Sequence, residues 1–133
     1  MAIADKSSLP IAVYLSSASP SEVRLVEETI THRFTKETPK LLIGDKAYDS
    51  DPLDHLLKSK YDISLVAPHK VNRVKENTQD GRQLRRYKRR WKVERFNAWV
   101  QNYRRVTVRW DYHASSYLGF VHLACVLILL RLI

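Results

Sequence analysis

The chain has 133 residues, enough for one hydrophobic core and therefore one domain spanning 1–133. Its hydrophobic share of 44% and its charged share of 28% are ordinary for a globular protein in water. A single cysteine, Cys125, excludes an intrachain disulfide framework and fits a reducing cytoplasm. The net charge of +9 is high and favours a partner of opposite charge.

The positive charge is concentrated in one block, from Arg82 to Arg109. This block holds eleven of the 23 Lys and Arg residues and one acid, Glu94, while the rest of the chain holds twelve cations against thirteen acids. With one acid among eleven cations, few stabilising ion pairs can form along a helix, and the cations repel one another. The block therefore predicts contact with the phosphates of a nucleic acid. The alternative is a solvated helix that keeps the protein soluble.

The first half of the chain predicts a hairpin, a helix and a strand. Two short apolar runs, 3–4 and 10–15, are separated by polar, turn-prone residues, as in a β-hairpin. A helix is expected from Ser19, as its N-cap, to about residue 33. The apolar run Leu41–Ile43 predicts a buried strand, and Asp45 follows at its C-terminal end.

The second half alternates further helices with one strand. A helix is expected to begin at Ser50-Asp51-Pro52, and the run 63–67 predicts a strand stopped by a proline. After a polar loop over 69–80, a long basic helix is expected over about 84–103 and an apolar helix over about 115–132. The order β-β-α-β-α-β-α-α predicts an α/β domain whose helices cover a mixed sheet.

The apolar C-terminal region, 113–133, predicts a buried core helix. Its most apolar part, Tyr117 to Leu130, contains His122 and is shorter than a membrane span requires, so no membrane partner is expected. Met1 is not followed by the basic stretch and apolar core of a signal peptide. These features favour a cytoplasmic protein.

Asp45 and Glu94 are the acids whose placement favours chemistry. In open α/β sheets, sites form beyond the carboxyl ends of strands, where Asp45 lies. Glu94 is the one carboxylate of the basic helix, on the face expected to carry Tyr87, Arg90 and Gln101. Together they are suited to Mg²⁺, which takes oxygen ligands and would activate water or a 3′-hydroxyl. Two alternatives stay open, namely that Asp45 is a turn residue and that Glu94 is an ion-pair partner of Arg90.

Other polar and aromatic residues give weaker signals. Trp91, Trp99 and Tyr103 lie among cations and are suited to stacking on bases, although helical spacing makes core positions the more frequent explanation. The histidines, His69 among them, have no Cys or second His at ligand spacing, so no zinc site is predicted.

Two motifs resemble those of bacterial insertion-sequence transposases of the DDE superfamily. The segment 42–50, Leu-Ile-Gly-Asp-Lys-Ala-Tyr-Asp-Ser, is similar to the family's segment around its second aspartate, Gly-Asp-Lys-Gly-Tyr-Asp. The segment 87–95 resembles the signature Tyr-x-x-Arg-x-x-x-Glu, which carries the third acid. The segments 102–106 and 114–130 resemble those that follow in this family. Two motifs in the expected order make the resemblance specific.

The resemblance implies a role for each matched residue. Asp45 and Glu94 would be the second and third acids and would bind Mg²⁺ or Mn²⁺. Gln101 stands where the family has a lysine, which removes a phosphate-binding cation. The residues expected to bind DNA are Tyr87, Arg90, Lys92, Arg95, Arg104 and Arg105.

The resemblance also implies an RNase H-like mixed sheet with flanking helices that is truncated at its N-terminus. In that fold class the first aspartate lies on a strand before the hairpin, and here only Met1 and Ala2 precede the hairpin. Asp5 is expected to be a turn former and not a replacement. The missing strand would be the central one, between the hairpin and the strand before Asp45. Without it, two strands would keep unpaired edges or would pair with each other.

Three functions remain open from the sequence. The first is Mg²⁺-dependent DNA cleavage and strand transfer at the terminal inverted repeats of a mobile element, with chemistry only if an N-terminal portion is supplied by another chain or by translational frameshifting. The expected partners in that case are DNA and either an N-terminal transposase fragment or a homo-oligomer. The second is a non-catalytic DNA-binding remnant or regulator. The third is an unrelated RNA- or DNA-binding module in which Asp45 and Glu94 are incidental.

Overall fold

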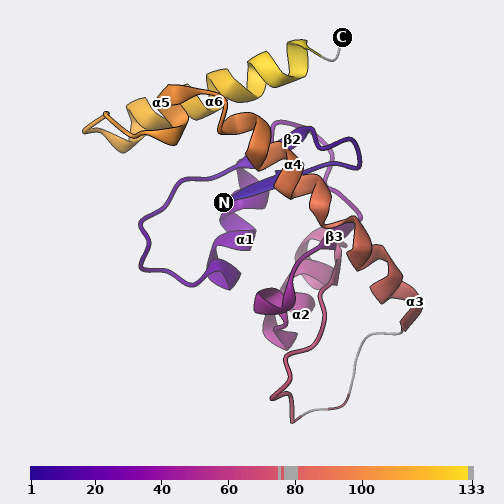
Figure 1. The fold of residues 1–133 in the computed structure, drawn as a ribbon. Coiled ribbons are helices and arrows are strands. Elements are labelled where there is room, and N and C mark those ends of the chain that lie inside the picture. Colours follow the sequence, from indigo (N-terminus) through magenta and orange to yellow (C-terminus); the bar gives the residue numbers. More distant parts are fainter. Residues whose placement is uncertain (75, 77–80, 132–133) are drawn as a thin grey trace.

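The computed structural model describes residues 1–74, 76 and 81–131 (Figure 1). In chain order the elements are β1 (Ala2–Ala4), β2 (Pro10–Val13), α1 (Glu22–Thr31), β3 (Leu41–Ile43), the 3-10 turn η1 (Lys46–Tyr48), α2 (Asp51–Tyr61), β4 (Ser64–Val66), α3 (Gly81–Leu84), the 3-10 helix η2 (Arg85–Arg89), α4 (Trp91–Val100), α5 (Arg104–Thr107) and α6 (Ala114–Leu130). The α/β class expected from the sequence is confirmed.

The strands form two small sheets. β1 and β2 pair antiparallel as the predicted hairpin, while β3 and β4 pair parallel. Within the described residues no ladder joins β1 to β3, so the expected single mixed sheet is not formed. In the part of the chain that the structure describes, β1 and β3 do not pair with each other, and each forms a ladder along one edge.

The hairpin turn is built around Asp5. Its Oδ1 accepts hydrogen bonds from the backbone amides of Ser7 (2.7 Å) and Leu9 (2.8 Å), so its expected role as a turn former is confirmed. Ser8, between these two residues, is fully buried and has a φ of 69°, in the left-handed region. A short polar side chain tolerates that backbone conformation better than a branched one does.

Two hydrophobic clusters lie on opposite faces of β1. Ala2 and Ala4 pack on a cluster of Phe96 with residues of β2 and α6, whereas Met1 and Ile3 pack on a cluster formed mainly by α1 and α2. This alternation follows from the two-residue period of a strand. Leu42 of β3 and Leu65 of β4 pack on the second cluster as well. Both sheets therefore contribute to one core beneath α1 and α2.

Two of the predicted helices differ from those in the structure. The N-cap of α1 is Ser21 and not Ser19, because Ser19 and Pro20 lie in a bend before the first helical turn. The long basic helix expected over 84–103 is instead the last residue of α3 followed by η2 and α4, and α4 ends at Val100. Leu84 and Arg90, at the junctions, keep helical backbone angles. The segment from α3 to α4 therefore forms one rod, seen crossing the molecule in Figure 1, with a tighter turn where the charge density is greatest.

The last helix, α6, is apolar on more than one face. Val121, Ala124, Cys125 and Ile128 are buried, which confirms the expected core helix and the buried cysteine. The opposite face carries a second apolar stripe at helical spacing, with exposed fractions between 38% and 61%: Leu123, Val126, Leu127 and Leu130. Residues 132 and 133, part of the predicted helix, lie outside the described residues. Among the described helices, none combines the length and hydrophobicity that a membrane crossing needs.

We expect Phe96→Ala to destabilise the protein strongly. Phe96 is 2% exposed and joins α4 to α6 and to Val13 of β2, so its removal leaves a cavity at their junction. The free energy of unfolding in urea should fall by about 3–5 kcal/mol. Val108→Ala, at a 46% exposed position, serves as the control and should change it by no more than about 0.5 kcal/mol. Equal losses in the two variants would contradict this account of the core.

Candidate active site and nucleic-acid interface

Asp45 lies immediately beyond the carboxyl end of β3, on the exposed side of a tight turn. It is the N-cap of η1, and its Oδ1 accepts a hydrogen bond from the amide of Ala47 at 2.7 Å. Its backbone carbonyl accepts a second bond from the amide of Tyr48 at 3.1 Å. The turn-residue alternative therefore describes its geometry correctly. That geometry also leaves the Asp45 side chain exposed to solvent.

Gly44 and Tyr48 pack closely against each other in this turn. A Cβ on Gly44 would lie 2.9 Å from Cδ2 of Tyr48, so only a glycine lets the ring lie against the strand end. The ring is half-buried and packs on the α1–α2 cluster. Burial, together with the nearby carboxylates of Glu22 and Asp45, raises the pKa of Tyr48 well above its usual value. Tyr48 is therefore a neutral anchor that fixes η1 to α1.

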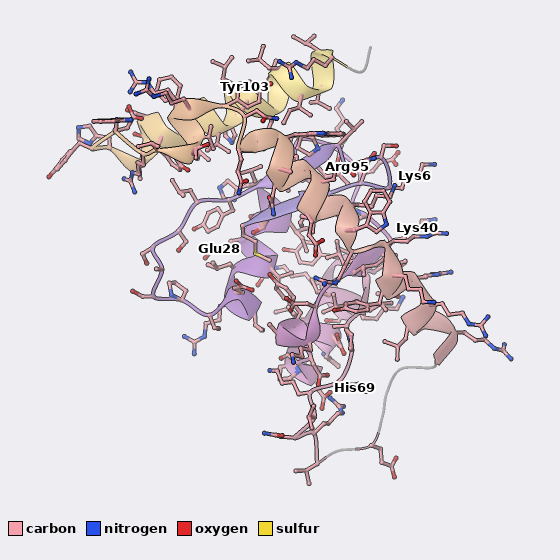
Figure 2. All side chains as sticks on the ribbon, in the orientation of Figure 1. Lys6, Glu28, Lys40, His69, Arg95 and Tyr103 are labelled. Carbon is pink, nitrogen blue, oxygen red and sulfur yellow. The ribbon has the colours of Figure 1, made fainter. Side chains whose placement is uncertain are left out.

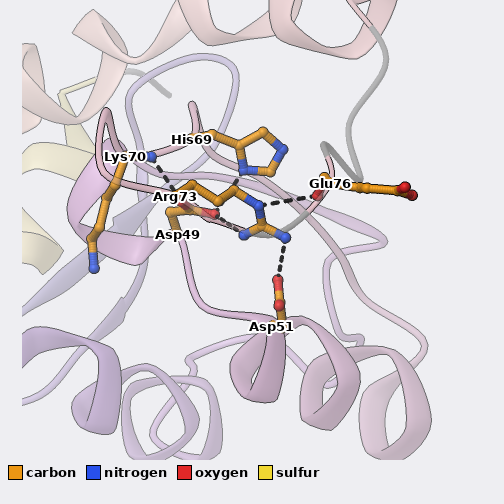
Figure 3. Close-up of polar contacts among 6 residues, drawn as sticks. All are labelled: Asp49, Asp51, His69, Lys70, Arg73 and Glu76. Carbon is orange, nitrogen blue, oxygen red and sulfur yellow. Dashed lines mark hydrogen bonds and ion pairs between the residues drawn. The ribbon is translucent and has the colours of Figure 1, made fainter.

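Asp49, at the end of η1, is the centre of a buried polar cluster (Figure 3). Its carboxylate is 3% exposed and meets Nδ1 of His69 at 2.8 Å, the amide of Lys70 at 2.7 Å and the guanidinium of Arg73 at 3.0 Å. Arg73 also pairs with Asp51, the first residue of α2, at 2.6 Å. Burial raises the pKa of Asp49, but these three donors outweigh burial and hold the pKa below its ordinary value. The cluster joins the segment after β4 to the segment after β3.

Glu94 lies in the first turn of α4 and faces Arg90. Their side chains form an ion pair of 2.7 Å, with 55% of Glu94 and 49% of Arg90 exposed. The Arg90 guanidinium also lies 5.5 Å from the ring of Tyr87, so three residues of the signature contact one another in sequence order. The ion-pair alternative for Glu94 thus describes a contact that the structure contains. An exposed pair of this kind stabilises a protein by only about 0–1 kcal/mol.

The cations of η2 and α5, together with Arg90, are exposed, whereas the two cations of α4, Lys92 and Arg95, are partly buried. Arg95 donates hydrogen bonds to Oγ of Ser8 (2.9 Å) and to the carbonyl of Ser7 (3.1 Å). These bonds bring the hairpin turn, with exposed Lys6, against α4. Figure 2 shows Lys6 and Lys40 on the right-hand side of the molecule, with Arg95 inward of them on α4. Arg104 and Arg105, on α5, are exposed.

The aromatic residues of this region divide into two groups. Trp99 and Tyr103 pack against the hydrophobic cluster beneath α4, as core residues do. Trp91 is 44% exposed, with Nζ of Lys92 at 3.9 Å and the Arg95 guanidinium at 4.9 Å from its ring. The stacking hypothesis therefore has geometric support only at Trp91.

The proposed metal ligands come from adjoining elements without forming a full metal site. η2, which leads into α4, lies against β3, which leads into Asp45. Among the described residues, no group of three His, Cys, Asp or Glu side chains is arranged to hold a metal ion. Asp45 and Glu94 each have a local partner, Ala47 and Arg90 respectively.

Sequence reasoning missed the Asp49 cluster. Asp49 was part of the motif that carries the resemblance, but no role was given to it, and its three partners lie 20, 21 and 24 residues further along the chain. His69 was considered only as a zinc ligand. The cluster could have been predicted from two acids near the start of α2, Asp49 and Asp51, which are followed by a loop that contains a histidine and two cations.

Comparison of the sequence with known proteins shows its family. The family model of the transposase DDE domain matches residues 1–129. The chain belongs to this family. It is 37% identical over 92 residues to a putative transposase for insertion sequence element IS6501 from Brucella ovis, an alignment covering 68% of this chain and 67% of that protein. It is 27% identical over 134 residues to a putative transposase for insertion sequence element IS402 from Burkholderia cepacia, covering 95% of this chain and 59% of the relative.

These DDE transposase relatives are longer than the chain, which spans about three fifths to two thirds of their length. No solved structure matches the chain significantly. The family assignment therefore rests on sequence, and it covers both the Asp45 turn and the α4 signature.

We expect Gly44→Ala to displace the turn that carries Asp45. The added methyl group would overlap the Tyr48 ring, and the free energy of unfolding should fall by about 1–3 kcal/mol. Gly119→Ala is the matched control, because a Cβ there meets nothing within 4 Å and the residue is helical. It should raise the free energy of unfolding by about 0.5–1 kcal/mol. A Gly44→Ala protein as stable as the control would show that the Tyr48 ring does not depend on this glycine.

Proposed function

We propose that this chain supplies two of the three acids of an insertion-sequence transposase, Asp45 and Glu94, and acts in metal-dependent cleavage and transfer of DNA strands. The observation that carries the proposal is the family match, which includes both motifs over residues 1–129. The geometry supports it, since one acid follows a parallel strand and the other lies on the helix that continues from η2, the segment packed on that strand. The DNA would be the terminal inverted repeats of the element.

The two acids suit a hard cation but do not complete a site. Both are exposed carboxylates, and Mg²⁺ or Mn²⁺ binds to such oxygens. A bound metal ion would activate water or a 3′-hydroxyl and neutralise charge on the phosphodiester. Within this chain, Oε1 of Glu94 pairs with Arg90, so metal binding through that oxygen would release Arg90 to a phosphate. Because the exposed pair is weak, this exchange costs little.

We propose that the strand carrying a third acid would lie between the two sheets. β1 packs on the α1–α2 cluster through Ile3, and β3 packs on the same cluster through Leu42, yet no ladder in the described residues joins them. An added strand carrying the first aspartate would pair with both free edges and make one mixed sheet, as in an RNase H-like fold. We infer that the active protein obtains this strand from another stretch of polypeptide, either in a longer chain or in a complex.

We expect DNA nicking with Mg²⁺ or Mn²⁺ only when that strand is present. A labelled element end would be incubated with the chain alone and with the chain plus a peptide carrying the first strand and aspartate of a full-length relative. Asp45→Asn and Glu94→Gln should abolish nicking in the mixture. Asp62→Asn, a matched change at an exposed acid paired with Lys58, should leave it intact.

Two outcomes would contradict parts of this proposal. Nicking by the chain alone would show that no further acid is needed. Nicking that survives Asp45→Asn and Glu94→Gln would remove both acids from the reaction.

We expect the affinity for DNA to depend steeply on salt. If about six of the eleven cations in the basic block contact phosphates, the logarithm of the association constant should fall with the logarithm of the salt concentration, with a slope of about −5. Replacing Arg104 and Arg105 together by Gln should make that slope shallower by about 2. The paired control, Lys58→Gln with Lys60→Gln, removes two exposed cations of α2 and should leave the slope unchanged. A wild-type slope near zero would contradict nucleic-acid binding.

A second candidate function is DNA binding without catalysis. The observation that favours it is the local pairing of both acids, Asp45 with Ala47 and Glu94 with Arg90. It predicts the same salt dependence, with no nicking in either the chain or the mixture.

A further inference from the structure

We propose that Asp49 is a positioning residue for the reaction, holding the Asp45 turn in a fixed place relative to the cations that follow β4. The effect of Asp49 on catalysis rests on the proposed function. The structural part of the inference, the coupling of Asp49 to the Asp45 turn, stands on contacts that can be measured without any activity.

Asp49 is the most enclosed acid of the candidate site. Its side chain is 3% exposed, against 32% for Asp51, and Asp45 is exposed. Each of its oxygens has a donor: Oδ1 meets His69 and Arg73, and Oδ2 accepts from the amide of Lys70. A carboxylate surrounded in this way is unsuited to binding a metal ion, because its acceptor positions are occupied by protein donors. Its role is therefore to hold the chain.

The same residue ends the turn that Asp45 begins. η1 has only three residues, with Asp45 as N-cap and Asp49 as C-cap. The amide of Asp49 donates to the carbonyl of Lys46 (3.3 Å), and the amide of Tyr48 donates to the carbonyl of Asp45 (3.1 Å). Asp45 has no buried anchor of its own. Its position is set by Tyr48 and Asp49, the two buried or half-buried residues at the far end of the turn.

The cluster also fixes the segment that follows β4. Asp49 binds the amide of Lys70 directly, and Arg73 bridges Asp49 to Asp51 at the start of α2. Figure 3 shows the Lys70 side chain extending away from the cluster, and this side chain is exposed. β3 and β4 are parallel, so both segments emerge at the same edge of the sheet. Asp49 thus keeps Asp45, the proposed metal ligand, and the exposed cation Lys70 at a constant separation.

The negative charge of Asp49 is required to hold the cluster together, and a neutral side chain of the same shape is not sufficient. Asn keeps the size of the side chain but has one acceptor oxygen in place of two, and it leaves the buried Arg73, 10% exposed, with a weakened counter-charge. A buried donor that loses its partner opens the structure locally. Opening at this point would free both the Lys70 segment and the η1 turn.

The test is amide hydrogen exchange of the full-length chain, followed residue by residue by NMR. Asp49→Asn should speed exchange at the Lys70 amide, its direct partner, and also at the Ala47 amide, which is bonded to Asp45, each by about tenfold. Exchange in the buried part of α6 should be unchanged. Arg73→Lys, which retains the His69 and Lys70 bonds, should give a smaller increase at both amides. Asp62→Asn is the matched control and should alter neither.

Faster exchange at Lys70 with no change at Ala47 would overturn the proposal, because Asp49 would then act on its own partner only. If Asp49→Asn fails to fold, Arg73→Lys decides the question by the same two amides. In the complemented nicking reaction, Asp49→Asn should lower kcat by at least about tenfold while KM for DNA stays within twofold. A complete absence of nicking in the wild-type mixture would contradict the proposed function while leaving the exchange result intact.

Discussion

Phe96 is buried among Val13 of β2 and the inner face of α6, and its neighbour Arg95 is bonded to the hairpin turn at Ser7 and Ser8. These two adjacent residues fix α4 to the rest of the molecule, one through apolar contact and the other through hydrogen bonds. Glu94 pairs with Arg90 and is not one of these contacts. The position of α4 relative to the strands is therefore set mainly by Phe96 and Arg95.

The difference between local and long-range contacts explains how much of the molecule could be predicted from the sequence. The hairpin, the strand Leu41–Ile43 and α6 were predicted correctly, because their apolar periodicity and turn residues are local. The prediction of one continuous helix over 84–103 was wrong, since η2 packs against β3 and this long-range contact is not visible in the local pattern. The Asp49 cluster was not found at all. Its members come from a motif and from a polar loop without periodicity, and only the parallel pairing of β3 and β4 brings them together.

The candidate site combines two levels of rigidity. Asp45 and Glu94 are exposed, and each is held by a single weak local partner. Directly behind Asp45, Tyr48 and Asp49 are enclosed and held by several contacts. An exposed carboxylate on a rigid support can exchange one partner for another at low cost, while its backbone keeps its place. Such an arrangement suits ligands for an ion that binds together with its substrate. The rigidity that the ligands need is then supplied when the turn folds.

The outer stripe of α6 has a practical consequence for handling the protein. Leu123, Val126, Leu127 and Leu130 remain partly exposed on a helix that has no Lys, Arg, Asp or Glu along its length. Sulfate and phosphate salts strengthen the burial of such surface, whereas dilute buffers strengthen the attraction of the basic block to contaminating nucleic acid. High concentrations of sulfate or phosphate therefore favour aggregation through α6. Low ionic strength favours co-purification of cellular DNA and RNA. A chloride salt at intermediate strength, with a mild detergent, lies between them.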